Sequence, residues 1–311
     1  MSPRAGSAQT IARVIVAYGS HGLAMLNESS EHATAGRCEP ASVKIHFRRS
    51  VGRALPGDQV QLGEDDEVVE ILPRTNTFGR GGKQAKFQPL AANIDHLFIV
   101  IAPEPKPSLD LLHRYVAAAR IQNIEPVFVL NKQDLLAPMD RLTRRTIVDQ
   151  LEAFNIPVHH IQCKPQLKLG ALAALLNKGI HLLVGQSGVG KSTISNALLP
   201  NLDLETRALS KTTGKGRHTT TAAMLRALPN GGWLVDSPGV WEYSLWRMPR
   251  EELARAFHEF SGVAEACRFR DCTHRQEPGC QVVIAVENGL ISEFRYQGWL
   301  RLLKEQNRLS N

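Results

Sequence analysis

The amino-acid sequence predicts a multidomain α/β protein in which a small N-terminal β-barrel precedes a mainly parallel sheet, and a small helical domain follows. Short β-rich stretches separated by turn residues fill residues 11–72, which is typical of a barrel. From residue 97, apolar strand-like runs alternate with helix-like stretches, which favours a parallel sheet with helices on both faces. Three cysteines and a histidine gather in residues 267–280, as in small domains that a metal ion stabilises. We therefore expect three domains, at residues 1–83, 84–245 and 246–311.

The N-terminal strands are expected at residues 11–18, 22–26, 42–47, 58–62 and 68–72. Gly, Pro, Asn and Ser separate them, and residues 53–58 form a predicted turn. About five short strands suit an OB-fold barrel, and their number suits an SH3-like barrel equally well. Residues 75–88 are rich in Gly and Lys and show no periodicity, so we expect a linker or a mobile loop there.

The remaining elements follow from the alternation of apolar runs and helical spacing. Strands are expected at residues 97–102, 127–130, 158–162 and 180–184, and helices at 108–121, 140–154, 170–176, 191–198, 250–260 and 291–309. Residues 221–227 and 233–236 flank Asn230-Gly231, which is a strong hairpin signal.

A complete phosphate loop of the form GxxxxGK(S/T) follows the predicted strand at 180–184 and opens the next helix; it reads Gly185-Gln186-Ser187-Gly188-Val189-Gly190-Lys191-Ser192. The backbone N–H groups of such a loop and the start of the helix bind phosphate oxygens. We expect Lys191 to reach the outer phosphates and to be needed for catalysis. The Ser192 hydroxyl is expected to coordinate Mg²⁺, and Thr193 completes the predicted nucleotide-binding segment.

A base-reading motif, Asn131-Lys132-Gln133-Asp134, directly follows the predicted strand at 127–130. The Asp134 carboxylate can accept hydrogen bonds from the N1–H and the exocyclic amine of guanine. Adenine does not offer this pair of donors, so Asp134 predicts GTP rather than ATP. We expect Asn131 to brace the loop and to touch the base edge, and Lys132 to lie along the plane of the base.

A third motif, Asp236-Ser237-Pro238-Gly239, ends the predicted strand at 233–236 and matches DxxG. We expect Asp236 to approach Mg²⁺ through a water molecule and the Gly239 N–H to bind the γ-phosphate. DxxG alone is a weak pattern that also describes ordinary turns. Its position at the end of a strand, downstream of the phosphate loop, favours the functional interpretation.

The first switch of a GTPase is expected between the phosphate loop and DxxG, where residues 216–221 read Gly-Arg-His-Thr-Thr-Thr. Thr219 and Thr220 are both candidates to complete Mg²⁺ coordination in the GTP state. Val240 follows DxxG, where many GTPases carry a glutamine that orients the attacking water. Histidine can accept a proton near neutral pH, so His218 is a candidate for that catalytic role; a structural loop histidine remains equally open.

The order of the motifs is unusual. Ordinary GTPases carry the phosphate loop first, then DxxG and then NKxD, whereas here NKxD comes first. This order indicates a circular permutation: the same site, with the chain cut and rejoined elsewhere. It requires residues 131–134 and 185–192 to fold into one pocket.

The cysteine cluster has the spacing Cys267-x4-Cys272-x-His274-x5-Cys280. Three thiolates and one imidazole form a complete tetrahedral set for one structural Zn²⁺, with no position left open for catalysis. The alternative is a chance group of buried cysteines, which charged neighbours such as Arg268 and Asp271 disfavour. Cys38 and Cys163 lie far away in sequence and are expected to be unpaired thiols.

Composition indicates a globular protein, and its moderate positive charge is compatible with a polyanionic partner. The chain has 311 residues, 43% hydrophobic and 22% charged. We find no apolar run of transmembrane length and no signal-peptide core in the first ten residues, so we expect a cytoplasmic protein without a membrane partner. We also expect a monomer, although the sequence itself does not give the oligomeric state. The net charge is +7, and three basic clusters beside a nucleotide switch favour an RNA partner; they are Arg37/Lys44/Arg48/Arg49/Arg53, Arg80/Lys83/Lys86 and Arg207/Lys211/Lys215/Arg217.

Over nearly its whole length the sequence resembles the circularly permuted GTPases called ribosome small-subunit-dependent GTPase A. The motif order, the GRHTTT segment, the barrel and the cysteine cluster carry the resemblance. It implies an OB-fold, a permuted GTPase domain and a zinc-binding C-terminal domain. It also implies rRNA binding, late assembly of the small ribosomal subunit, and GTP hydrolysis stimulated by that subunit. One departure is Cys163-Lys164, where GTPases usually carry Ser-Ala in the loop that supports guanine.

Three other functions stay open at this point. The protein could act on the large subunit or another RNA, or it could sense GTP without meaningful turnover, which Val240 favours. ATP hydrolysis is the remaining alternative, against Asp134. In the main hypothesis, loss of the γ-phosphate moves the DxxG switch, which leads through residues 240–250 into the zinc domain and shifts it relative to the barrel.

Overall fold

The computed structural model describes residues 10–26, 42–136, 138–163, 166–199, 223–236 and 243–310. The N-terminal strands form a closed barrel with the order β1-β2-β3-β5-β4. Their bounds are β1 (Thr10–Tyr18), β2 (His21–Leu26), β3 (Ser42–Phe47), β4 (Gln59–Leu62) and β5 (Glu67–Ile71). Strands β3 and β5 pair in parallel, and the other pairs are antiparallel. A five-stranded barrel that closes in this Greek-key order is an OB-fold. The strand order therefore distinguishes the OB-fold from the SH3-like barrel, which the number of strands alone did not.

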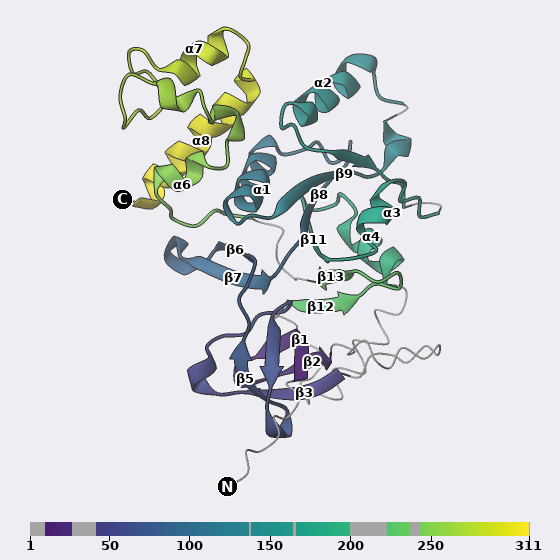
Figure 1. Ribbon diagram of the computed structural model, residues 1–311. Helices are drawn as coiled ribbons and strands as arrows, with labels where there is room; N and C mark the ends of the chain where they lie inside the picture. Colours follow the sequence, from purple (N-terminus) through teal and green to yellow (C-terminus); the bar gives the residue numbers. More distant parts are fainter. Residues whose placement is uncertain are drawn as a thin grey trace.

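Residues 75–88 are not the linker or mobile loop that the sequence predicted. They contribute to an antiparallel hairpin of β6 (Thr77–Gly81) and β7 (Phe87–Ala92). A Cβ atom on Gly79 would lie 2.5 Å from the Phe87 ring, and one on Gly81 would lie 2.5 Å from the Leu245 carbonyl oxygen. The glycines therefore allow close packing, and they were mistaken for signs of flexibility. Figure 1 shows the hairpin between the barrel and the helices that cover the larger sheet.

A six-stranded sheet forms the centre of the molecule, with the order β10-β9-β8-β11-β13-β12. Its strands are β8 (His96–Ile101), β9 (Glu125–Leu130), β10 (Val158–His160), β11 (Ile180–Val184), β12 (Met224–Ala227) and β13 (Trp233–Asp236). All neighbours are parallel except β12 and β13. The mainly parallel sheet and its closing hairpin agree with the sequence prediction.

Helices cover both faces of this sheet. They are α1 (Leu109–Ile121), α2 (Arg141–Glu152), α3 (Leu172–Leu175) and α4 (Lys191–Leu198). Alternate residues of β8 face opposite cores, as the period of a strand requires. Ile99 belongs to the core that includes α1 and α2, and Val100 to the core that includes α3 and α4. This burial on both faces explains the unbroken apolar run at residues 97–102.

The barrel packs on the edge strand of the central sheet. Val16 and Leu23 of the barrel form a small apolar cluster with Met224 of β12. Strand β12 is the first described element after residues 200–222, in which the predicted first switch lies. The barrel therefore contacts the strand into which that switch leads.

The C-terminal part contains α6 (Arg250–Ala254), α7 (Gln281–Glu287) and α8 (Glu293–Ser310). The helix predicted at residues 250–260 is too long, because Phe257 has non-helical dihedral angles (φ −109°, ψ 74°). The chain bends there and brings the Phe257 and Phe260 rings edge-on to Trp299, at centroid distances of 5.4 and 5.6 Å. Helix α7 was not predicted. Helices α6 and α8 pack beside α1, as Figure 1 shows. Within the described ranges, no helix combines the length and apolarity needed to cross a membrane.

Candidate nucleotide site and metal centre

The base-reading motif and the phosphate loop contact each other directly. They follow β9 and β11, which lie on either side of β8, so both loops open at the carboxyl edge of the sheet. The Asn131 side-chain amide donates to the Val189 carbonyl (3.0 Å), and the Lys132 ammonium donates to the Gly188 carbonyl (2.8 Å). The permuted chain thus places its two nucleotide motifs side by side.

Two positions of the phosphate loop require glycine. Gly185 has φ +144°, and a Cβ atom there would lie 2.3 Å from the Val100 carbonyl oxygen. Gly190 has φ +101°, and its Cβ would lie 2.4 Å from the Asn131 amide nitrogen. The left-handed backbone and the lack of space both exclude a side chain. Gly190 is therefore the residue that lets Asn131 reach the loop.

Lys191 is the first residue of α4, and its ammonium points back into the phosphate loop. It donates to the carbonyl oxygens of Gly185 and Gln186, each at 2.7 Å. Burial lowers the pKa of Lys191 from its ordinary value. Ser192 is exposed and Thr193 is partly buried beside it. The Lys191 ammonium, the one cationic side chain of the phosphate loop, therefore lies next to the backbone groups that are suited to bind phosphate.

The base-reading residues differ in burial. Asn131 is buried, and its Oδ1 atom has no hydrogen-bond partner among the described residues. Lys132 adopts the left-handed conformation (φ +58°) and also donates to the Glu104 carbonyl at 2.9 Å. Asp134 follows in a short 3-10 helix, Gln133–Leu135, and is exposed. The motif thus braces the phosphate loop with two residues and presents a carboxylate to solvent with a third.

The other predicted switch residues divide between described and undescribed parts of the chain. Asp236 ends β13, and one of its carboxylate oxygens lies 3.9 Å from the Arg226 Nε atom. Gly239, Val240, His218, Thr219 and Thr220 lie outside the described residues. Cys163 follows an isolated bridge between Gln162 and Lys168, whereas Lys164 also lies outside the described ranges.

Sequence reasoning missed two residues near the phosphate loop, one directly before α1 and one within it. The Ser108 N–H, at the start of α1, donates to the Gln186 side-chain oxygen at 3.0 Å. Tyr115 lines a small cavity with Gln186 and Val189 of the phosphate loop, and burial raises the pKa of Tyr115 to about 12, while the Gly185 backbone acts to lower it. The sequence carries no signal for either contact, because Ser108 reads as a helix cap and Tyr115 as one of many apolar helix positions.

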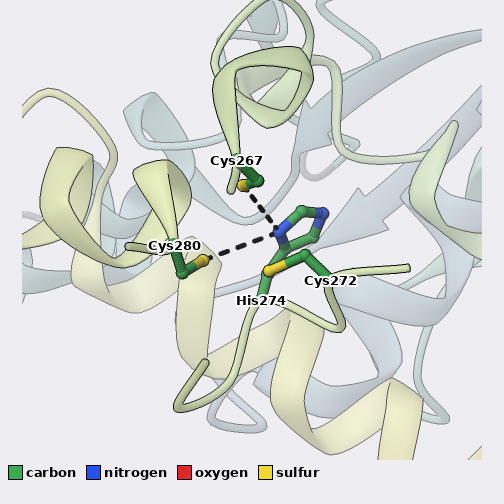
Figure 2. A group of neighbouring side chains, drawn as sticks. All are labelled: Cys267, Cys272, His274 and Cys280. Atoms are coloured by element: carbon green, nitrogen blue, oxygen red, sulfur yellow. Dashed lines mark hydrogen bonds between the residues drawn. The ribbon is translucent and has the colours of Figure 1, made fainter. Parts of the chain in front are cut away.

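The predicted zinc ligands converge in the C-terminal part, as Figure 2 shows. The ligand atoms of Cys267, Cys272, His274 and Cys280 all lie within 4.8 Å of one another. The His274 Nδ1 atom lies 3.6 Å from the Cys267 sulfur and 3.7 Å from the Cys280 sulfur. Ligands in a tetrahedral Zn²⁺ site, at about 2.3 Å for sulfur and about 2.0 Å for nitrogen, are about 3.6 Å apart. The spacing therefore fits a tetrahedral metal ion.

The loop between the ligands is held by one carboxylate. Glu277 accepts from the backbone N–H groups of Thr273 (2.8 Å) and Arg275 (2.9 Å). Burial acts to raise the pKa of Glu277, but these hydrogen bonds and that from the Thr273 hydroxyl lower it to about 2. The Tyr296 hydroxyl donates to the His274 carbonyl at 3.0 Å, and the Trp299 indole to the Thr273 carbonyl at 3.3 Å. Helix α8 is thus attached to the metal-binding loop.

Comparison with known proteins covers almost the whole chain. A family model described as "RsgA GTPase" matches residues 71–246, more than half of the chain. A Vibrio vulnificus (strain YJ016) protein named "Small ribosomal subunit biogenesis GTPase RsgA 1" is 38% identical over 299 residues, which are 94% of this chain and 82% of that protein. A Haemophilus influenzae (strain PittGG) protein named "Small ribosomal subunit biogenesis GTPase RsgA" is 37% identical, over 90% of this chain and 86% of that protein.

Two solved structures share the fold. The crystal structure of YjeQ from Thermotoga maritima has a TM-score of 0.75 and 25% identity, and the match covers 96% of this chain and 99% of that one. YloQ, described as a circularly permuted GTPase, has a TM-score of 0.73 and 23% identity, with coverage of 99% and 98%. The barrel, the permuted sheet and the C-terminal helices therefore recur together in solved proteins.

Proposed function

Because this chain belongs to the RsgA GTPase family, we propose that it binds GTP, hydrolyses it to GDP and phosphate, and assists late maturation of the small ribosomal subunit. The observation that carries the proposal is the direct contact of Asn131 and Lys132 with the phosphate loop. One pocket then holds the guanine base at one end and the triphosphate at the other. The names of the two bacterial relatives support the small ribosomal subunit as the partner.

Each motif residue has a role in this proposal. Asp134 reads the guanine edge, and Lys191 turns from the loop carbonyls to the outer phosphates. Ser192 and Asp236 would hold Mg²⁺, which would offset the charge of the phosphate oxygens. Gly239 donates to the γ-phosphate, Thr219 or Thr220 completes the Mg²⁺ shell, and His218 positions the attacking water in place of the glutamine that Val240 replaces.

The metal of the C-terminal cluster is proposed to be Zn²⁺, one ion per chain. The support is chemical: three thiolates and an imidazole at tetrahedral spacing suit zinc, whereas Mg²⁺ and Ca²⁺ prefer oxygen ligands. Burial raises the pKa of Cys272 to about 12 and also raises that of Cys280. Three thiolates in this space therefore require a cation.

The three proposed domains are residues 1–83, 84–245 and 246–311. The family match ends at residue 246, which supports the boundary between the second and third domains. Hairpin β6–β7 spans the boundary between the first and second domains. Lys44 on the barrel and Lys83 and Lys86 at the hairpin turn are exposed, which supports rRNA binding by that end of the molecule. Arg48 is a weaker candidate, because it pairs with Glu67. We further propose a monomer that works in the cytoplasm.

The decisive experiment measures multiple-turnover GTP hydrolysis with purified small or large ribosomal subunits. We expect small subunits alone to raise the rate, GTP to outcompete ATP, and Lys191→Ala to abolish turnover while the fold is kept. Stimulation by large subunits would reassign the partner. Val240 keeps one rival open: GTP binding without turnover under every condition would identify a GTP-sensing RNA-binding module instead.

A further inference from the structure

The segment that follows DxxG is fastened to the hairpin rather than to the C-terminal part alone. Tyr243 is fully buried, and its hydroxyl donates to the Gly79 carbonyl of β6 at 2.6 Å. The Gly79 N–H in turn donates to the Gln122 side-chain oxygen at 2.6 Å. Tyr243 comes four residues after Gly239 of DxxG. The chain that follows the DxxG motif is therefore attached, at Tyr243, to the hairpin that joins barrel and sheet.

Backbone hydrogen bonds extend this attachment on both sides of the hairpin turn. The Gly81 N–H donates to the Ser244 carbonyl at 2.8 Å, and the Arg247 N–H donates to the Ala85 carbonyl at 2.7 Å. Gly81 leaves no room for a Cβ atom beside Leu245. Residues 243–247 thus run along the hairpin and follow any displacement of it.

An aromatic contact continues from Tyr243 to the phosphate loop. The Tyr243 ring lies 5.1 Å from the Tyr115 ring and 5.9 Å from the Phe78 ring, between centroids. Tyr115 lines a small cavity with Gln186 and Val189 of the phosphate loop, and the carbonyl of Gly185 in that loop accepts a hydrogen bond from Lys191. Contacts within a close-packed core transmit displacement, because side chains there have few alternative positions. The hairpin, Tyr243, Tyr115 and the phosphate loop form one continuous series.

We propose that Tyr115 is a positioning residue for nucleotide binding. It places the first glycine of the phosphate loop according to how residues 243–247 lie on hairpin β6–β7. The affinity for nucleotide then depends on the position of the hairpin. A partner that displaces the hairpin therefore changes the affinity for nucleotide. By linkage, bound nucleotide changes the affinity for that partner by the same factor. This inference rests on the proposed nucleotide site, and it adds a connection from that site to the barrel.

The link is insensitive to pH in the physiological range. Burial raises the pKa of Tyr115 to about 12 and raises that of Tyr243. Both phenols stay neutral, so both hydroxyls keep their protons.

A double-mutant cycle on GDP affinity tests the link, with Tyr115→Phe, Tyr243→Phe and the double variant. Each change removes one hydroxyl and keeps the ring. Loss of one hydrogen bond of ordinary strength corresponds to about a fivefold change in affinity. We expect Tyr115→Phe to raise the dissociation constant of GDP about fivefold and Tyr243→Phe about threefold. Because both hydroxyls act through the same series of contacts, the dissociation constant of the double variant should rise only about fivefold. This rise is well below the product of the two single effects.

Tyr296→Phe is the matched control, because it also removes a buried hydroxyl that donates to a backbone carbonyl, in the C-terminal part. It should lower the melting temperature and leave GDP affinity unchanged. Singles that behave like this control, or a double variant that equals the product of the singles, would overturn the proposal. If Tyr243→Phe fails to fold, Phe78→Leu replaces it. Failure of the wild type to bind GDP would instead refute the proposed function.

Discussion

At the scale of single residues, the nucleotide site combines side chains that are held in place with side chains that are left free to meet the ligand. Asn131 and Lys191 are fixed by backbone carbonyls of the phosphate loop. Asp134 and Ser192 are exposed. The Asn131 contact thus pre-organises the phosphate loop, which reduces the entropy lost on binding, whereas Lys191 must leave its carbonyl partners to reach a phosphate. In the proposed function, base selectivity depends on Asp134, whose exposed carboxylate exchanges water for guanine as its hydrogen-bond partner.

Replacing that carboxylate should change the preferred base. In Asp134→Asn, the side chain loses one acceptor for guanine and gains an amide donor that matches the 2-carbonyl of xanthine. We expect GTP affinity to fall about 100-fold, because two charge-assisted hydrogen bonds are lost or weakened, and xanthosine triphosphate to bind better than GTP. Titration calorimetry measures both, with Asp149→Asn on the surface of α2 as the control. Unchanged GTP affinity would show that Asp134 does not read the base.

At the scale of elements, the contact of α1 with α8 depends on a histidine that fills the space above a glycine. His113 is buried between the Phe154 and Phe294 rings, at 4.9 and 4.8 Å between centroids. Its Nδ1 donates to the Leu109 carbonyl at 2.8 Å. A Cβ atom on Gly298 of α8 would lie 1.9 Å from the His113 ring. Helices α1 and α8 can approach this closely because α8 carries a glycine, Gly298, opposite His113.

Gly298→Ala should destabilise the protein, although alanine normally stabilises a helix by about 1 kcal/mol relative to glycine. The methyl group would overlap the His113 ring, and overpacking of a core costs about 1–3 kcal/mol. Urea denaturation followed by circular dichroism gives the free energy of unfolding. In the Gly298→Ala/His113→Ala double variant the overlap is relieved, so the loss should be smaller than the sum of the two single losses. An additive result would contradict this packing.

Two buried histidines should make stability fall in mild acid. Burial, with a smaller effect of Arg295, lowers the pKa of His113 to about 4, and burial, with His96, lowers that of His181 to about 4. The unfolded chain takes up protons near pH 6.5 and the folded chain only near pH 4. The folded state therefore loses stability as pH falls from about 6.5 to 4, by about 3 kcal/mol for each histidine.

His113→Phe keeps an aromatic ring and removes one of the two titrations. Urea midpoints between pH 7 and pH 4 should then vary about half as strongly as in the wild type. The exposed His160 provides the control through His160→Gln, which should leave the pH dependence unchanged. An unaltered slope in His113→Phe would show that His113 is not the titrating group.

The sequence was a good guide to elements whose pattern is set locally. Strands β11 and β13 and helix α4 lie at their predicted bounds, because apolar runs and the phosphate-loop glycines define them. Hairpin β6–β7 was misread, because its glycines serve close contacts: Gly79 with Phe87 inside the hairpin, and Gly81 with Ser244 and Leu245, which lie far away in sequence. The helix at Arg250 was predicted too long, because its end is set by the contacts of Phe257 and Phe260 with Trp299.

At the scale of the whole molecule, the C-terminal part combines a candidate metal site with a helix, α8, that packs against α1 of the GTPase domain. Trp299 bonds the metal-binding loop, and on the same helix Glu305 pairs with Arg114 of α1 at 2.8 Å. Motif order predicted the permuted nucleotide site, and cysteine spacing predicted the metal cluster. The contacts between the parts could not be predicted, since Tyr115 and Gly298 read as ordinary helix positions.

Removal of the metal should loosen the C-terminal part and spare the nucleotide site. The metal-binding loop and α8 share hydrogen bonds, whereas the phosphate loop is braced by Asn131 and Lys132. Chelation should lower the melting temperature by about 5 °C or more, because a structural zinc ion contributes about 10 kcal/mol in isolated fingers. GDP affinity should stay within about twofold. Re-addition of Zn²⁺ is the control, and equal loss of both properties would contradict this independence.

The central position of β11 has a consequence for protein synthesis. Strand β8 pairs with β9 on one side and with β11 on the other, and His96 lies opposite His181 in that second pairing. About 85 residues separate these partners. At a synthesis rate of 5–20 residues per second, one edge of β8 therefore stays unpaired for roughly 4–17 seconds on the translating ribosome. An uncovered strand invites pairing with another chain. In a nascent copy of this protein, one edge of β8 therefore stays unpaired until β11 has been made. An unpermuted GTPase makes its phosphate-loop strand first, so its corresponding strands are unpaired at a different stage of synthesis.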